Sequence, residues 1–256
     1  MLNYRIYGEL AEGNTPLVVL HGLLGSLDNW HSFATRYSST QPIIALDMRN
    51  HGNSPHVMGM TYQLMVEDIL ATLNQLAIES FDLIGHSMGG KASMVLATQN
   101  PDLVKRLIVV DIAPYTYRPR LQTLLHAMIS ISLSTLKSRK EADGKLSEVV
   151  NSAFERGFLL KNLSRQSDGT FQWLCHLPEI TRNYLKITGF PSLTPHYTGS
   201  VLAVAGGQSD YVTEETWESM QALFPQARLE YIEAAGHLPH VQTPDRFEQL
   251  VREFLS

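Results

Sequence analysis

The amino-acid sequence predicts an α/β fold: a doubly wound, mostly parallel sheet with an inserted, mostly helical cap. Two observations predict it. Short apolar runs alternate with longer amphipathic segments, and this alternation stops after one strand and returns late in the chain. The 256 residues are enough for one large domain with an insertion. We therefore expect residues 1–113 and 198–256 to form the core, and residues 114–197 to form the cap.

The first half of the core supplies four expected strands. They are continuous apolar runs, which are typical of strands covered on both faces, at residues 16–22, 42–48, 81–87 and 106–114. The expected helices between them are residues 26–39, 61–78 and 90–101. Thr61 is expected to cap the second helix, and Pro101 to end the third. After the insertion, strands are expected at 201–207 and 228–237, and helices at 213–224 and 243–256.

The insertion breaks this alternation. We expect helices at residues 121–136 and 146–163 and a turn at 167–173. Residues 114–197 carry a charge balance of +5, whereas the rest of the chain carries −10. The excess is explained either by ordinary solvated helix faces or by a positive field that attracts anionic substrates.

Composition excludes several classes of protein. The only cysteine, Cys175, allows no internal disulfide and suits a reducing cytoplasm. The first residues lack the pattern of a signal peptide, and no apolar run is long enough for a membrane helix. The net charge of −5 disfavours nucleic-acid binding. We therefore expect a cytoplasmic protein that binds a small molecule, as a monomer or a homodimer.

The most informative segment is "GHSMG", residues 85–89, which matches Gly-x-Ser-x-Gly. It follows the apolar run "FDLI" and precedes the helical segment "KASMVLA". In that setting the pattern is typical of a nucleophile elbow, a strained turn that lifts Ser87 above the sheet. A plain glycine-rich turn is the alternative interpretation.

A serine hydroxyl becomes a good nucleophile only when a base removes its proton. His237 follows the last expected strand, where a loop can reach the end of the sheet. His240 is the local alternative. The spacing of these two histidines lacks the third ligand or the glutamate of a zinc motif, so we expect no metal site.

Backbone amides should stabilise the oxyanion that forms when the serine attacks. Met88 follows the nucleophile directly, and Leu23 lies in a glycine-rich loop after the first apolar strand. We expect these two amides to be the donors. His21 is expected to be a structural histidine, and Asp47 and His51 are expected to hold loops together.

Two aspartates are candidates for the acid that orients His237. Asp210 follows a strand, and Asp111 ends the preceding strand at the same edge of the sheet. Asp210 could instead be a turn residue, and Asp111 could tie down the start of the insertion. A carboxylate directly after four apolar residues would be costly without a partner, which favours a role for Asp111.

Five segments together resemble the YbfF-type bacterial esterases of the α/β-hydrolase superfamily: "HGLLGSLDNW", "DMRNHGNSP", "GHSMGGKASM", "VVDIAP" and "AGHLPH". The resemblance implies an α/β-hydrolase fold with a cap, no cofactor, and hydrolysis of short- to medium-chain acyl esters, with acyl-CoA thioesters as further substrates. It assigns Ser87, His237 and the amides of Leu23 and Met88 to the site, and it makes Asp111 a candidate acid beside Asp210.

The sequence therefore predicts a serine esterase that works through an acyl-enzyme on Ser87. Two alternatives use the same residues. One is a carbon–carbon bond hydrolase or synthase with the same triad, and the other is a non-catalytic receptor that retains the pocket. A dehalogenase is disfavoured because the elbow carries a serine and not an aspartate.

Overall fold

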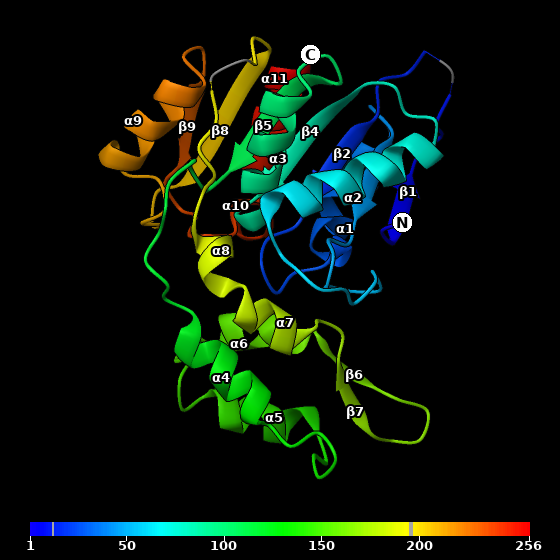
Figure 1. The fold of residues 1–256 in the computed structure, drawn as a ribbon, viewed down its shortest axis with the longest axis vertical. Coiled ribbons are helices and arrows are strands. Elements are labelled where there is room, and N and C mark those ends of the chain that lie inside the picture. The colour runs from blue at the N-terminus through cyan, green and yellow to red at the C-terminus, as the bar shows by residue number, and fades with distance from the viewer. Residues whose placement is uncertain (12, 195–196) are drawn as a thin grey trace.

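The computed structural model describes residues 1–11, 13–194 and 197–256, and a seven-stranded sheet forms its centre (Figure 1). The strands of this sheet are β1 (Tyr4–Tyr7), β2 (Leu17–Leu20), β3 (Ile43–Leu46), β4 (Phe81–His86), β5 (Val104–Val110), β8 (Ser200–Gly206) and β9 (Arg228–Ile232). Their spatial order is β1-β3-β2-β4-β5-β8-β9. All neighbours are parallel except β1, which pairs antiparallel with β3. The predicted mostly parallel sheet is confirmed, with β1 as an additional edge strand.

Helices cover both faces of the sheet (Figure 1). They are the 3-10 helix η1 (Leu27–Trp30) and the α-helices α1 (His31–Tyr37), α2 (Tyr62–Gln75), α3 (Met88–Gln99), α9 (Glu214–Leu223), α10 (Pro239–Gln242) and α11 (Pro244–Leu255). Successive side chains of β2 point to opposite faces, so Leu17 and Val19 join one buried cluster, and Val18 and Leu20 join the other. The first cluster contains residues of α1 and α11, and the second contains residues of α2 and α3. The continuous apolar strands thus reflect burial on both sides.

Two helix boundaries follow the sequence signals. The hydroxyl of Thr61 accepts a hydrogen bond from the backbone N–H of Leu64, so Thr61 caps α2. Helix α3 ends at Gln99, two residues before Pro101. Both predictions are confirmed.

The segment between β5 and β8 is built from short helices and one hairpin joined by irregular stretches, and we call its described part, residues 114–194, the insertion. Its elements are α4 (Gln122–Ser130), α5 (Arg139–Leu146), α6 (Ala153–Leu160), the hairpin of β6 (Leu163–Arg165) and β7 (Phe171–Trp173), α7 (Leu177–Arg182) and α8 (Tyr184–Thr188). Helices α4–α7 lie beyond the end of the sheet at which β4 and β5 finish (Figure 1). Residues 195–196, at the end of the expected cap, are outside the described residues.

The expected elements of the insertion need correction. The helix expected at 121–136 ends at Ser130, and the one expected at 146–163 is interrupted, because residues 147–152 are not helical. Ser152 explains the interruption: its hydroxyl accepts a hydrogen bond from the N–H of Glu155 and starts a new helix there. The turn expected at 167–173 includes part of the β6–β7 hairpin. None of the described helices is long and apolar enough to cross a membrane.

Lys91 of α3 connects the core to both ends of the insertion. Its side chain is buried, and its ammonium donates hydrogen bonds to the carbonyls of Tyr115 at 2.8 Å, Thr188 at 2.8 Å and Gly189 at 2.9 Å. It also lies 4.8 Å from the centroid of the Tyr117 ring. Burial lowers the pKa of Lys91 to about 7. One side chain therefore holds the segment that enters the insertion beside the end of α8, near the point where the chain leaves it.

Replacing Lys91 by methionine is expected to lower the free energy of unfolding by about 2–4 kcal/mol, because three partly buried carbonyls lose a shared donor. Urea unfolding of the variant beside the wild type measures this. Lys161→Met, at an exposed position of the insertion, is the matched control and should unfold like the wild type. Equal unfolding midpoints for Lys91→Met and the wild type would contradict the prediction.

Candidate active site

The sheet changes its winding direction between β2 and β4. The chain proceeds from β2 to β3 on one side, and from β4 to β5 on the other. In α/β sheets, ligands bind at the carboxyl ends of the strands at such a point. The loop after β2 passes very near the end of β4: a Cβ on Gly22 would lie 2.7 Å from Nδ1 of His86 and 3.1 Å from Cβ of Ser87. The topology therefore brings the two glycine-rich loops together.

Ser87 occupies the strained turn between β4 and α3, with φ of 52° and ψ of −116°. Such backbone angles cost about 1–3 kcal/mol in a residue other than glycine. The flanking glycines make the turn sterically feasible, because a Cβ on Gly85 would lie 2.3 Å from the carbonyl oxygen of Gly89. A Cβ on Gly89 would lie 2.6 Å from the carbonyl oxygen of His21. Ser87 thus has the strand–turn–helix setting that its motif predicts.

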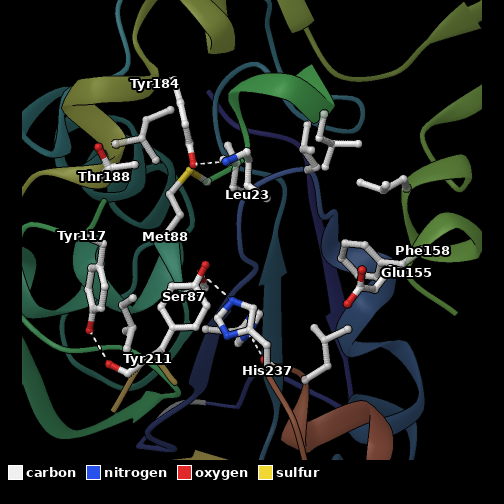
Figure 2. A pocket seen from close by; sticks show the side chains of 18 of the residues that line it. Leu23, Ser87, Met88, Tyr117, Glu155, Phe158, Tyr184, Thr188, Tyr211 and His237 are labelled. Atoms are coloured by element: carbon white, nitrogen blue, oxygen red, sulfur yellow. Dashed lines mark hydrogen bonds between the residues drawn. The ribbon is translucent and has the colours of Figure 1, made fainter. Parts of the chain in front are cut away.

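The side chain of His237 lies between Ser87 and Asp111. Figure 2 shows its ring beside Ser87. Its Nε2 is 3.1 Å from Oγ of Ser87, and its Nδ1 is 2.7 Å from Oδ2 of Asp111. The carboxylate of Asp111 is fully buried. Oδ1 accepts a hydrogen bond from the N–H of Gly206 at 2.9 Å, and Oδ2 accepts one from the hydroxyl of Ser209. With Nδ1 protonated, His237 donates a hydrogen bond to the aspartate, and its Nε2 is free to accept one from the hydroxyl of Ser87.

Asp210, the other candidate acid, is not brought to His237. Its side chain is 66% exposed and forms an ion pair with Arg120. The loop after β8 turns Ser209 toward Asp111, so that Asp210, the next residue, faces solvent. The loop after β8 does contact the buried carboxylate of Asp111, but it does so through Ser209 and not through Asp210. The structure therefore leaves Asp111 as the candidate acid.

Two other histidines, His86 and His240, lie near the site, and neither is the one that bridges Ser87 and Asp111. His240 is buried, and its ring stacks on Trp30 with a centroid distance of 4.2 Å. Burial lowers the pKa of His240 to about 3. His86 donates from Nε2 to the carbonyl oxygen of His237 at 2.6 Å, and burial lowers its pKa well below the usual value. His86 thus holds the backbone of His237 and remains neutral.

Leu23 and Met88, the expected sources of the oxyanion amides, both line the cavity beside Ser87 (Figure 2). Met88 is the first residue of α3, where a backbone N–H has no acceptor within the helix. The loop of Leu23 is fixed through Leu24, whose φ is 59°. The N–H of Leu24 donates to Nε2 of His51 at 3.1 Å, and its carbonyl accepts from Nδ2 of Asn162 at 2.6 Å.

Asn162 belongs to the insertion and was not predicted, because nothing in its local sequence indicates contact with a loop 138 residues away. His51 was expected to hold loops together, and burial lowers its pKa to about 3, which keeps Nε2 an acceptor. Asp47 likewise accepts hydrogen bonds from the backbones of Leu27 and Asn53. The neutral His21, with a pKa lowered to about 4 by burial, accepts at Nε2 from the backbone N–H of Met48. These residues are structural, as the sequence predicts.

A cavity of about 490 Å³ opens above Ser87 between the core and the insertion. Its size is that of an ordinary small-molecule site. Its wall is predominantly apolar, and the insertion contributes Leu121, Leu124, Val150, Phe154, Phe158, Leu159 and Ile187. Charged side chains at the cavity are Lys91, Arg118 and Glu155. Within the described residues, Arg118 is the only lysine or arginine of the insertion that lines it.

Comparison with known proteins places this geometry in a family. Residues 15–244 match the family described as the alpha/beta hydrolase fold. The sn-1-specific diacylglycerol lipase ABHD11 of Xenopus laevis is 38% identical over 100% of this chain and 84% of its own length. Esterase YbfF of Escherichia coli is 36% identical, covering 100% of this chain and 99% of its own. A solved structure, the marine microorganism esterase, superimposes with a TM-score of 0.94 at 38% identity, covering 99% of this chain and 98% of the other.

These similarities confirm the resemblance and the fold class that the sequence predicts. They extend over the whole chain, including the insertion, and are not limited to the serine motif. The chain is therefore a hydrolase that belongs to the alpha/beta hydrolase fold family.

Proposed function

We propose that the protein is a serine esterase that hydrolyses short- to medium-chain carboxylic esters, with Ser87 as nucleophile, His237 as base and Asp111 as the orienting acid. One observation carries the proposal: His237 lies within hydrogen-bond distance of both Ser87 and the buried Asp111. The names of the relatives, an esterase and a lipase, support an ester as substrate. The apolar wall of the cavity suits an acyl chain.

In the first half of the reaction, Oγ of Ser87 forms a bond to the ester carbonyl carbon, and its proton passes to Nε2 of His237. The carbonyl oxygen becomes an oxyanion that the amides of Leu23 and Met88 stabilise. As the bond to the alcohol oxygen breaks, His237 gives its proton to the leaving alcohol. Asp111 stays ionised and keeps Nδ1 of His237 protonated and correctly oriented.

In the second half, a water molecule attacks the acyl carbon and gives a proton to His237. The tetrahedral intermediate then collapses, the bond to Oγ of Ser87 breaks, and the proton of His237 returns to Ser87. The products are a carboxylic acid and an alcohol, and the enzyme is regenerated.

A fluorophosphonate probe combined with an ester series tests this proposal. Mass spectrometry of the labelled protein should place the phosphonyl group on Ser87, and nitrophenyl esters of increasing acyl length should be hydrolysed with an optimum at short to medium chains. Dienone-type substrates form the comparison panel. Turnover of these alone would instead support a carbon–carbon bond hydrolase, and the absence of labelling on Ser87 would contradict both.

Acyl-CoA thioesters are a second substrate class, and Arg118 is the observation that favours them. The insertion carries the positive balance, but several of its cations are paired with carboxylates, among them Arg120, Arg156 and Arg182. Arg118 is exposed and lines the cavity, where a phosphorylated leaving group could reach it. Arg118 is therefore the residue at which the positive charge of the insertion would act on an anionic substrate.

Arg118→Gln is expected to lower kcat/KM for an acyl-CoA about three- to tenfold and to leave a neutral ester of the same acyl chain nearly unchanged. Added salt should weaken the acyl-CoA preference of the wild type in the same way, because it screens exposed charges. Lys161→Gln is the control at an exposed site. If the acyl-CoA preference is insensitive to both salt and Arg118→Gln, the electrostatic explanation is wrong.

A further inference from the structure

The loop after β8 contacts two of the three residues to which we assign the reaction. Ser209 donates its hydroxyl hydrogen to Oδ2 of Asp111. Two residues later, the ring of Tyr211 stacks on the imidazole of His237, with ring centroids 4.1 Å apart and planes inclined by 20° (Figure 2). The proposed reaction gives Tyr211 no role, although the face of its ring lies directly against the imidazole of His237.

The position of Tyr211 is fixed by its own backbone. Its carbonyl oxygen accepts a hydrogen bond from the hydroxyl of Tyr117 at 2.7 Å and one from the hydroxyl of Thr216 at 3.1 Å. Its N–H donates to the hydroxyl of Ser209 at 3.3 Å. Tyr117 belongs to the first, non-helical segment of the insertion, so the core and the insertion together hold the ring in place.

A ring face at this distance has an electrostatic consequence. The π face of an aromatic ring attracts a cation within about 6 Å of its centroid, and the attraction is stronger when the pair is desolvated. As the base of the proposed reaction, His237 becomes an imidazolium when it takes the proton of Ser87. The attraction therefore strengthens as the transition state forms, which is the condition for raising kcat.

We propose that Tyr211 is a positioning residue for His237: its ring face holds the imidazole in line with Ser87 and Asp111, and stabilises the imidazolium that forms during turnover. The inference rests on the proposed function, because it takes His237 as the base. It goes beyond that function by assigning part of the stabilisation to an aromatic residue that makes no hydrogen bond to the triad side chains.

Other groups around His237 set the background for this effect. The titratable and charged groups around it are Asp111 at the end of β5, His86 at the end of β4, His240 on α10 and the Arg120–Asp210 pair beside Tyr211. Lys91, Arg118 and Glu155 line the same cavity as His237. Burial keeps His86 and His240 neutral at working pH by lowering their pKa values. Arg120 lies 6.0 Å from the centroid of the Tyr211 ring, and its ion pair with Asp210 offsets its charge. Among the described groups in direct contact with the His237 ring, Asp111 and Tyr211 favour the imidazolium.

Two variants of Tyr211 separate the ring face from the hydroxyl. Tyr211→Leu removes the face, and kcat should fall between about 2- and 30-fold. The acid limb of the kcat/KM profile should move about 0.5–1 unit to lower pH, because the protonated base loses a stabilising neighbour. Tyr211→Phe keeps the face and should retain both the rate and the profile. Tyr231→Leu, the same change at a 44% exposed tyrosine of β9, is the matched control.

The position of the acid limb decides the inference, because a merely structural role for a cavity-lining residue would change kcat or KM without moving it. An unmoved limb in Tyr211→Leu, or a Tyr211→Phe variant as impaired as Tyr211→Leu, would overturn the proposal while ester hydrolysis by the wild type stands. If the wild type hydrolyses no ester, the proposed function fails instead. The pH dependence of fluorophosphonate labelling of Ser87 then applies the same test without a substrate.

Discussion

Ser87→Ala should lose on the order of 10⁴- to 10⁶-fold in kcat on any ester the wild type accepts, because no other group can form the acyl-enzyme. The substitution removes a hydroxyl whose only side-chain hydrogen bond within the described residues is to His237. The backbone at position 87 keeps its positive φ, so the free energy of unfolding should stay within about 1 kcal/mol of the wild type. Steady-state kinetics and urea unfolding of the same preparation measure the two effects.

The matched control for this loss is Ser39→Ala, which removes an exposed hydroxyl far along the chain from the elbow. It should hydrolyse esters at the wild-type rate. Residual activity of Ser87→Ala at a tenth of the wild-type rate would mean that hydrolysis does not proceed through this serine. A large drop in unfolding free energy would instead assign the loss of activity to the fold.

Asp111→Asn is the second substitution with a large expected effect, a fall in kcat of about 10⁴-fold. The amide that replaces the carboxylate can donate to Nδ1 of His237, which favours the wrong tautomer and takes the proton-accepting lone pair away from Nε2. It also leaves the imidazolium without its buried counter-charge. The hydrogen bonds from Gly206 and Ser209 to Asp111 make this position sensitive to any change of acceptor.

Asp210→Asn provides the comparison, because it makes the same chemical change at the other candidate acid, in the loop after β8. The side chain of Asp210 is 66% exposed and its ion pair with Arg120 is a surface pair, which typically contributes at most about 1 kcal/mol. Activity within about threefold of the wild type is expected. The reverse pattern, with Asp111→Asn active and Asp210→Asn inactive, would require the loop after β8 to rearrange in solution and would refute the assignment of the acid.

Local patterns were sufficient for much of the fold. The strands β2 to β5 are continuous apolar runs, and the segments between them have the amphipathic pattern of helices. The Thr61 cap is recognisable from its position before the second of these helices. β1 was not predicted, because its exposed edge position gives it no continuous apolar run. In the insertion, the apolar periodicity continues across Ser152, so the helix break there depends on a capping hydrogen bond that periodicity does not register.

The candidate site also combines residues that have a local sequence signal with residues that have none. The motifs around Ser87 and His237 carry their own local signals, a glycine-flanked turn and a loop after a strand. The contacts that orient these residues carry none. Lys91, Asn162, Ser209 and Tyr211 are ordinary residues in the sequence, and each acquires its place only because the fold brings a distant carbonyl, loop or ring beside it.

The sequence alone is enough to predict the class of sheet, the nucleophile motif, the candidate base and the insertion, because each depends on periodicity or on residues close together in the chain. The contact between His237 and Asp111, rather than Asp210, is visible only in the folded chain. Both aspartates follow strands that end at the same edge of the sheet, and their separation depends on which way one loop turns. That turn directs Ser209 and Tyr211 inward and Asp210 to solvent, through hydrogen bonds to residues about 100 positions away.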